Sequence, residues 1–167
     1  PAEHGIISNS PFDPLGTNAV NGKYGIPSTN PFVGTAGALG EIYAIGVRNP
    51  QRFAWDSKTG NMYVADIGQG IVEEISRVTA GANLGWNQWE GSFNYVGRQE
   101  IGLANQRGDP KLVYPVVEFD HADPLLLPLV AITIGPIYRR TEIPELANLL
   151  LFGDNPSGEI FYVNADA

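Results

Sequence analysis

A repeated pattern of two apolar runs constrains this chain more than any other feature. The segments "NMYVADIGQGIVEEISRV" (61–78) and "NLLLFGDNPSGEIFYV" (148–163) each hold an Asn, an apolar run, an Asp, a turn that contains Gly, and an alternating stretch that ends in Val. Alternation with a period of two is typical of half-buried strands, so each copy predicts a β-hairpin. Two copies of one hairpin unit indicate a radial β-repeat, most simply the blades of a propeller.

The composition also favours β structure. The chain has 167 residues, of which 20 are Gly and 13 are Pro, and only 17% are charged. Gly and Pro destabilise helix interiors, whereas the seven Tyr, seven Phe and three Trp suit a pleated surface. We therefore predict an all-β propeller fold. Because a closed propeller needs at least about four blades, this chain would cover roughly two to three blades of a larger one.

Residues 1–40 differ from the rest of the chain. They are rich in Gly, Pro, Asn and Ser and show little periodicity, which predicts a loop-rich excursion, whereas 41–167 form the blades of one incomplete domain. The first strands are expected at 41–47, 52–56, 61–66 and 73–78, later ones within 112–121, 131–140, 148–154 and 158–166, and a turn in "PELANLLL" before a strand. A start at Pro1 is consistent with a processed or excised piece.

Charge and cysteine content exclude several classes of function. The net charge is −8 without a basic stripe, which argues against binding nucleic acid or an anionic membrane. Cysteine is absent, so the sequence offers no disulfide and no thiolate metal site. No apolar run approaches the roughly 20 residues of a membrane helix, so no membrane span is expected.

The stretch "YAIGVRNPQRFAWD" (43–56) places Arg48 and Asn49 between two strand-like runs. From the residues alone, Arg48 is most simply the partner of an acidic residue at a strand end. The same plain interpretation makes His121 a loop histidine bonded to Asp120 or Asp123. Four other aspartates are expected to cap strand ends and turns: Asp56, Asp66, Asp154 and Asp166. The three tryptophans are expected to pack in the core or between blades, and for Trp86 and Trp89, which lie in a loop-like stretch, a sugar contact stays open as the alternative.

The motifs "AIGVRNPQRFAWD", "TGNMYVADIGQGIVEEI" and "AGANLGWNQWEG", in this order, resemble the glucose/sorbosone dehydrogenase family over about residues 40–165. These are soluble quinoprotein aldose dehydrogenases that use pyrroloquinoline quinone (PQQ) and calcium. The resemblance implies a six-bladed propeller with PQQ at its axis, in the periplasm or secreted. It also implies oxidation of the C1 hydroxyl of an aldose by hydride transfer to the quinone, with electrons passed to an acceptor.

The resemblance assigns site residues by motif. Arg48 and Asn49 of "RNP" would contact PQQ, and a guanidinium suits the carboxylates of that cofactor. The main-chain carbonyls of Gly68 and Gln69 would hold the calcium that bridges to PQQ, although the family often has Pro at the position of Gln69. The side chain of Glu74 and the main-chain oxygen of Leu84 would hold a structural calcium.

Plainer interpretations stay open for these positions. The Gly68 segment is also an ordinary turn, and Glu73 and Glu74 also suit a solvated strand edge. The catalytic base of the family is a histidine in an earlier blade, and neither His4 nor His121 matches it.

The isolated chain is therefore predicted to be inactive. Its expected partners are a sugar and an electron acceptor, together with the remainder of the propeller or a second copy of itself. The alternative function is a non-catalytic propeller that serves as a scaffold for protein or ligand binding.

Overall fold

The computed structural model describes residues 17–18, 25–124, 126 and 130–166. The chain divides into two compact units, Pro1–Ile45 with Ala80–Ala82 and Gly46–Thr79 with Asn83–Ala167. The predicted division into 1–40 and 41–167 stays a prediction. None of the helices in the described part is long and apolar enough to cross a membrane.

In the described part of the first unit, β1 (Thr17–Asn18) pairs with β2 (Gly25–Ile26) in an antiparallel arrangement. The strand predicted at 41–47 is wrong, because this segment makes only isolated contacts: Ile45 N donates to Ala82 O at 2.9 Å, and Tyr43 O accepts from Gly81 N at 2.8 Å. The next residue, Gly46, has a φ of +78°, a conformation that interrupts an extended strand.

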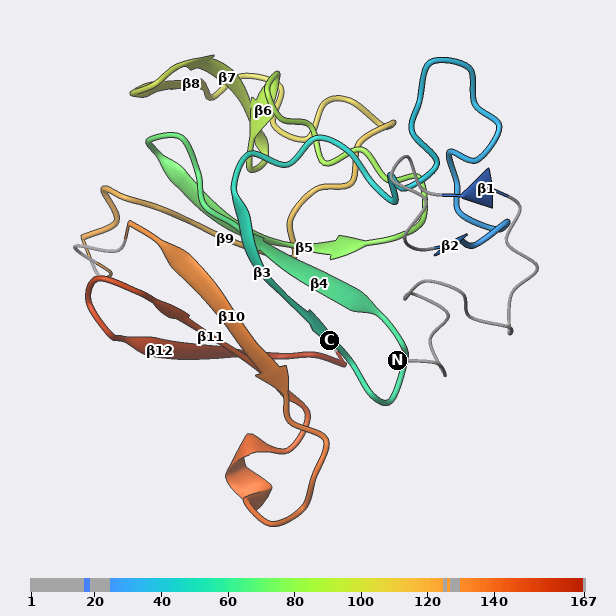
Figure 1. Ribbon diagram of the computed structural model, residues 1–167. Helices are drawn as coiled ribbons and strands as arrows, with labels where there is room; N and C mark the ends of the chain where they lie inside the picture. Colours follow the sequence, from blue (N-terminus) through green and yellow to red (C-terminus); the bar gives the residue numbers. More distant parts are fainter. Residues whose placement is uncertain (1–16, 19–24, 125, 127–129, 167) are drawn as a thin grey trace. The chain divides into compact units, whose positions relative to one another are not determined.

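Two antiparallel sheets form most of the second unit (Figure 1). One has the order β3-β4-β5-β9 and comprises Pro50–Trp55, Met62–Asp66, Val72–Val78 and Val117–Asp120. The other has the order β10-β11-β12 and comprises Ile132–Ile137, Leu149–Asp154 and Ile160–Asn164. A 3₁₀ helix, η2 (Pro144–Leu146), precedes β11 as the expected turn. The hairpins β4-β5 and β11-β12 are the two copies of the repeat recognised in the sequence, and in each sheet a preceding strand, β3 or β10, extends the hairpin to a three-stranded meander.

A third sheet was not predicted. It consists of β6 (Trp89–Glu90), β7 (Phe93–Gly97) and β8 (Glu100–Gly102), in that order. The stretch 80–97, which contains β6 and β7, is rich in Gly and Asn, and the strands are short, so the sequence indicates a loop there. Glu118 of β9 anchors this sheet, because its Oε2 accepts from Ser92 N at 2.8 Å and its Oε1 from Ser92 Oγ at 2.7 Å.

The apolar core joins the two larger sheets. Its buried members come from β4, β5, β10 and β11: Tyr63, Ala65, Ile75, Ile132, Ile134, Ile137 and Leu150. Trp89 is also buried and packs edge-on against Tyr114, as expected for a packing residue. Trp55 does not meet that expectation, because it lies on the edge strand β3 and is 55% exposed.

Candidate functional site

The turn between β4 and β5 (67–71) is held by buried carboxylates. Glu90 is 3% exposed, and its Oε1 accepts from the main-chain N atoms of Gly70, Ile71 and Val72, each at 3.0 Å. Gly68 N donates to Glu73 Oε1 at 3.2 Å. Successive amides that converge on one anion fix a backbone in a defined conformation. The carboxylates of Glu90 and Glu73 therefore hold the backbone of this turn in place from its buried side.

The glycines of this turn are required for close approach. A Cβ atom on Gly68 would lie 1.9 Å from Val72 O and 2.7 Å from Glu90 Oε1. A Cβ atom on Gly70 would lie 1.9 Å from Arg98 O. Because neither position has space for a side chain, only glycine lets the turn pass between its neighbours.

The side chain of Arg48 lies against the same turn. Its Nη1 donates to Ile67 O at 3.0 Å and to Gly68 O at 2.6 Å, and its Nε donates to Gln69 Oε1 at 2.9 Å. Three of the predicted site residues, Arg48, Gly68 and Gln69, are thus in direct contact. The carbonyl oxygen of Gly68 already faces a cationic group, and this geometry suits a hard cation such as calcium.

Asp66 fixes the backbone at the start of the site. Its Oδ2 accepts from Arg48 N at 2.8 Å and its Oδ1 from Asn49 N at 2.5 Å. Burial raises the pKa of Asp66, against the lowering effect of these two amides. The expectation that the Arg48 side chain pairs with a nearby acid is therefore wrong in detail, because the acid binds main-chain amides and the guanidinium binds main-chain carbonyls and Gln69.

Glu74 is buried, contrary to the interpretation of a solvated strand edge. It is 7% exposed, and burial raises its pKa well above the usual value, with further contributions from the charges of Asp66, Glu118 and Glu90. The Oε2 atoms of Glu74 and Glu90 have no hydrogen-bond partner within the described residues. A buried carboxylate oxygen without a partner is an available ligand for a cation.

Side chains alone do not complete a metal site. Within the described ranges, no group of three or more His, Asp or Glu side chains is arranged to hold a metal ion. A cation at Glu74 would therefore need main-chain or water oxygens as well. Leu84, the predicted main-chain ligand, is 3% exposed.

His121 was expected to bind Asp120 or Asp123, but the structure shows it bound to Glu73. Its Nε2 lies 2.9 Å from Glu73 Oε1, while Glu73 Oε2 accepts from Ile132 N at 2.8 Å. Glu73 is fully buried and thereby connects β5, the turn and β10. His4 lies outside the described residues.

Sequence reasoning assigned no role to Glu73 and missed Glu90 altogether. The one available signal for Glu90 was an acid placed between two apolar groups in "QWEGSF".

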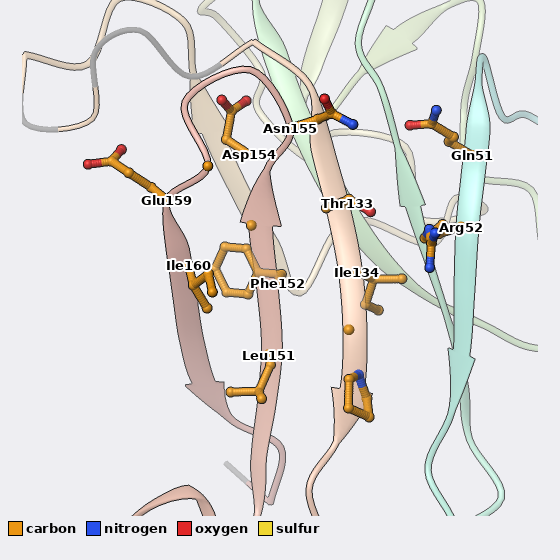
Figure 2. A pocket seen from close by; sticks show the side chains of 14 residues that line it. Gln51, Arg52, Thr133, Ile134, Leu151, Phe152, Asp154, Asn155, Glu159 and Ile160 are labelled. Atoms are coloured by element: carbon orange, nitrogen blue, oxygen red, sulfur yellow. The ribbon is translucent and has the colours of Figure 1, made fainter.

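A hollow of about 540 Å³ adjoins β3 and the β10-β11-β12 sheet (Figure 2). Gln51, Asp154 and Asn155 lie toward the end where β3 begins, while Leu151 lies toward the other end. Gln51 at this end belongs to the strand that directly follows Arg48 and Asn49, while Asp154 ends β11 and Asn155 begins the turn between β11 and β12.

Comparison with known proteins identifies the family. The model of the Glucose / Sorbosone dehydrogenase family matches residues 17–167. The chain belongs to this family. The match begins well before residue 40, so the first part of the chain carries more of the family pattern than the motifs alone indicated.

Comparison with three relatives shows what share of the length of a family member this chain matches. The HIPL2 protein of Arabidopsis thaliana is 35% identical over 103 residues, which is 61% of this chain and 15% of that protein. The aldose sugar dehydrogenase YliI of Escherichia coli is 35% identical over 72 residues, or 43% of this chain and 19% of that protein. The structure of the soluble aldose sugar dehydrogenase from Escherichia coli has a TM-score of 0.60 at 22% identity, covering 86% of this chain and 42% of that chain.

These matches confirm the fold prediction. The chain is all-β and corresponds to a portion of the six-bladed propellers of this family. It spans less than half the length of each of the three relatives. The two larger sheets are accordingly propeller blades.

Proposed function

We propose that the chain is part of a PQQ- and calcium-dependent sugar dehydrogenase that oxidises the C1 hydroxyl of aldoses. The proposal rests on one observation: Arg48 Nη1 donates hydrogen bonds to the main-chain carbonyls of Ile67 and Gly68. In one place, a guanidinium suited to a carboxylate ligand adjoins carbonyl oxygens suited to a hard cation. Membership of the glucose/sorbosone dehydrogenase family supports the same assignment.

Each residue of the site has a defined task in this proposal. Arg48 and Asn49 bind and orient the cofactor, and Asp66 holds their backbone in place. The carbonyls of Gly68 and Gln69 hold one calcium, while Glu74 and Leu84 hold a second, structural calcium. When bound, PQQ supplies the hydride acceptor and the first calcium acts as a Lewis acid on it.

We also propose that these residues alone give no turnover. A general base must be within hydrogen-bonding reach of the substrate hydroxyl. The histidine in the described part of the chain, His121, is engaged by Glu73. The sugar, the electron acceptor and the remainder of the propeller, or a second copy, are the proposed partners, in the periplasm or outside the cell.

The proposal is tested by calorimetric titration of the 167-residue chain with PQQ in the presence of Ca²⁺. We expect saturable binding that Arg48→Ala weakens by at least about tenfold, because charge-assisted hydrogen bonds are lost. Arg52→Ala is the matched control, since it removes one positive charge from an exposed position of β3. Equal binding by all three proteins, or no binding, would remove the cofactor assignment. Dye reduction with an aldose should be absent.

A non-catalytic scaffold is the second candidate. The engagement of His121 by Glu73 favours it, because it leaves the described residues without a free histidine base. This function predicts no PQQ binding in the same titration.

A further inference from the structure

We infer that Arg48 is an internal cation that competes with calcium for the carbonyl oxygen of Gly68. A ligand carboxylate that withdraws the guanidinium would then open this position to calcium. The inference rests on the proposed function and adds a regulation of the same site: cofactor and calcium binding are coupled through one side chain.

The contacts of Arg48 carry the first step. Its Nη1 binds Gly68 O at 2.6 Å, which is short for a hydrogen bond between nitrogen and oxygen, and also binds Ile67 O at 3.0 Å. Calcium binds oxygen ligands at about 2.3–2.6 Å. A guanidinium nitrogen and a calcium ion cannot both lie at such distances from one carbonyl on the same side without strong charge repulsion. Occupancy by one therefore opposes occupancy by the other.

The charges behind the turn carry the second step. Glu90 and Glu73 accept main-chain amides of the turn, and Asp66 accepts those of Arg48 and Asn49. These carboxylates are all buried, so their negative charge is poorly screened and favours a cation at the outer face of the turn. None of them binds the guanidinium itself among the described contacts, and Arg48 supplies the positive charge at this position.

The backbone of Arg48 carries the third step. Asp66 holds the main-chain N atoms of Arg48 and Asn49 independently of the side chain. The guanidinium can therefore leave the turn by side-chain rotation while the loop keeps its position. Arg48 is only partly buried, so such a rotation does not have to displace the core.

Reciprocal coupling follows from this arrangement. If PQQ draws Arg48 away from the turn, calcium affinity rises, and by linkage calcium raises the affinity for PQQ by the same factor. Without PQQ, the chain should bind calcium weakly at Gly68. A variant without the Arg48 side chain should therefore bind calcium in the absence of PQQ as tightly as the parent protein binds it in the presence of PQQ.

The experiment measures Ca²⁺ binding by calorimetry without PQQ. All proteins carry Glu74→Gln, which removes the other proposed calcium position. We expect Arg48→Met in this background to bind Ca²⁺ at least about tenfold more tightly than the parent, since a charge-assisted contact with the ligand oxygen is removed. The matched control Arg52→Met should change affinity less than about twofold, because exposed charges are screened.

Two further measurements keep the test decisive. Gln69→Ala removes the acceptor of Arg48 Nε and leaves the carbonyls intact, so it should tighten Ca²⁺ binding in the same direction by a smaller factor. Circular dichroism shows whether each variant is folded. If Arg48→Met does not fold, the Gln69→Ala titration decides.

The outcomes separate the inference from the proposed function. If the parent binds PQQ with calcium but neither variant gains Ca²⁺ affinity without PQQ, the competition is refuted and the cofactor assignment stands. If none of the proteins binds Ca²⁺ or PQQ under any condition, both are refuted. A gain in Arg48→Met and Gln69→Ala but not in Arg52→Met supports the competition.

Discussion

Arg139 binds Asp56 through two parallel hydrogen bonds, from Nε to Oδ1 at 2.8 Å and from Nη2 to Oδ2 at 2.7 Å. The two side chains are 8% and 0% exposed. Asp56 directly follows β3 and Arg139 lies two residues after β10, so this ion pair connects the two larger sheets. Arg139 also binds Asp166 at 2.8 Å, which extends the connection to the segment after β12.

The first prediction is that Arg139→Met destabilises the fold by about 3–5 kcal/mol, because removing one partner of a buried pair leaves the other charge uncompensated. Urea unfolding measures the change. Arg140→Met is the matched control, since its ion pair with Glu142 is 78% and 64% exposed, and it should change stability by less than about 0.5 kcal/mol. Equal effects of the two substitutions would show that the Asp56 pair does not stabilise the fold.

The second prediction concerns acid. Hydrogen bonds from Arg139 lower the pKa of Asp56 far below its usual value, and its Thr59 and Lys58 contacts act in the same direction. A carboxyl whose pKa is lowered by folding contributes stability above its unfolded pKa of about 3.9, and this contribution is lost as the pH falls below that value. Thermal unfolding between about pH 2 and pH 6 should show a steeper acid loss in the wild type than in Asp56→Asn. Parallel curves would contradict the assignment.

The third prediction is that Gly68→Ala disrupts the β4–β5 turn. A methyl group there would lie 1.9 Å from Val72 O, which is backbone and cannot rotate away. We expect a loss of about 2 kcal/mol or more in urea unfolding, and weaker Ca²⁺ binding. Gly97→Ala is the control, because no atom lies within 4 Å of its added Cβ and its φ is not positive. A Gly68→Ala protein as stable as Gly97→Ala would refute the close approach.

The sequence predicted the parts of this molecule that depend on local pattern. Both hairpins of the repeat follow from apolar alternation, and the resemblance brought Arg48 and the Gly68 turn into one site, where the structure shows them in contact. Burial of charge was harder to predict. Glu73 and Glu74 are consecutive in a strand, and local pattern suggests a solvated edge, but β9 pairs alongside this strand and Ile132 of β10 donates its main-chain N–H to Glu73.

The partners of the long side chains could not be predicted for a related reason. Arg139 reaches Asp56 from one sheet to the other, and His121 reaches Glu73 between the paired strands β9 and β5 of one sheet, both across large separations in sequence. Nearer acids, such as Asp120 for His121, were the natural choice from sequence alone. Tertiary contacts of this kind become visible only when the order of the strands is known.

The fourth prediction concerns Glu74 in the absence of metal. Burial and the neighbouring carboxylates raise its pKa well above the usual value. A carboxyl whose pKa is raised by folding costs no stability below its unfolded pKa of about 4.3, and the cost appears as the pH rises through the folded pKa. In calcium-free buffer, Glu74→Gln should therefore be more stable than the wild type at pH 8, and this advantage should vanish near pH 4. The control, Glu145→Gln at an exposed position, should show no such difference.

Calcium should reverse this order if Glu74 is a ligand. A bound cation removes the penalty of the buried charge and stabilises the native state by mass action. Melting temperatures at pH 8 with and without Ca²⁺ measure the effect. The wild type should gain stability and Glu74→Gln should gain less. Identical calcium responses in the two proteins would exclude Glu74 as a ligand.

The last prediction concerns Glu90, whose Oε1 accepts three consecutive amides. In Glu90→Gln the acceptor loses its charge and one oxygen becomes an NH₂ group, so the amides of Gly70, Ile71 and Val72 lose part of their stabilisation. Hydrogen exchange at these amides should become at least about tenfold faster. Glu118→Gln, which changes the acceptor of Ser92 N instead, should leave them unchanged. Unaltered exchange at 70–72 in Glu90→Gln would mean that the β4–β5 turn keeps its shape without the charge of Glu90, and the site would then depend on Gly68, Glu73 and Asp66.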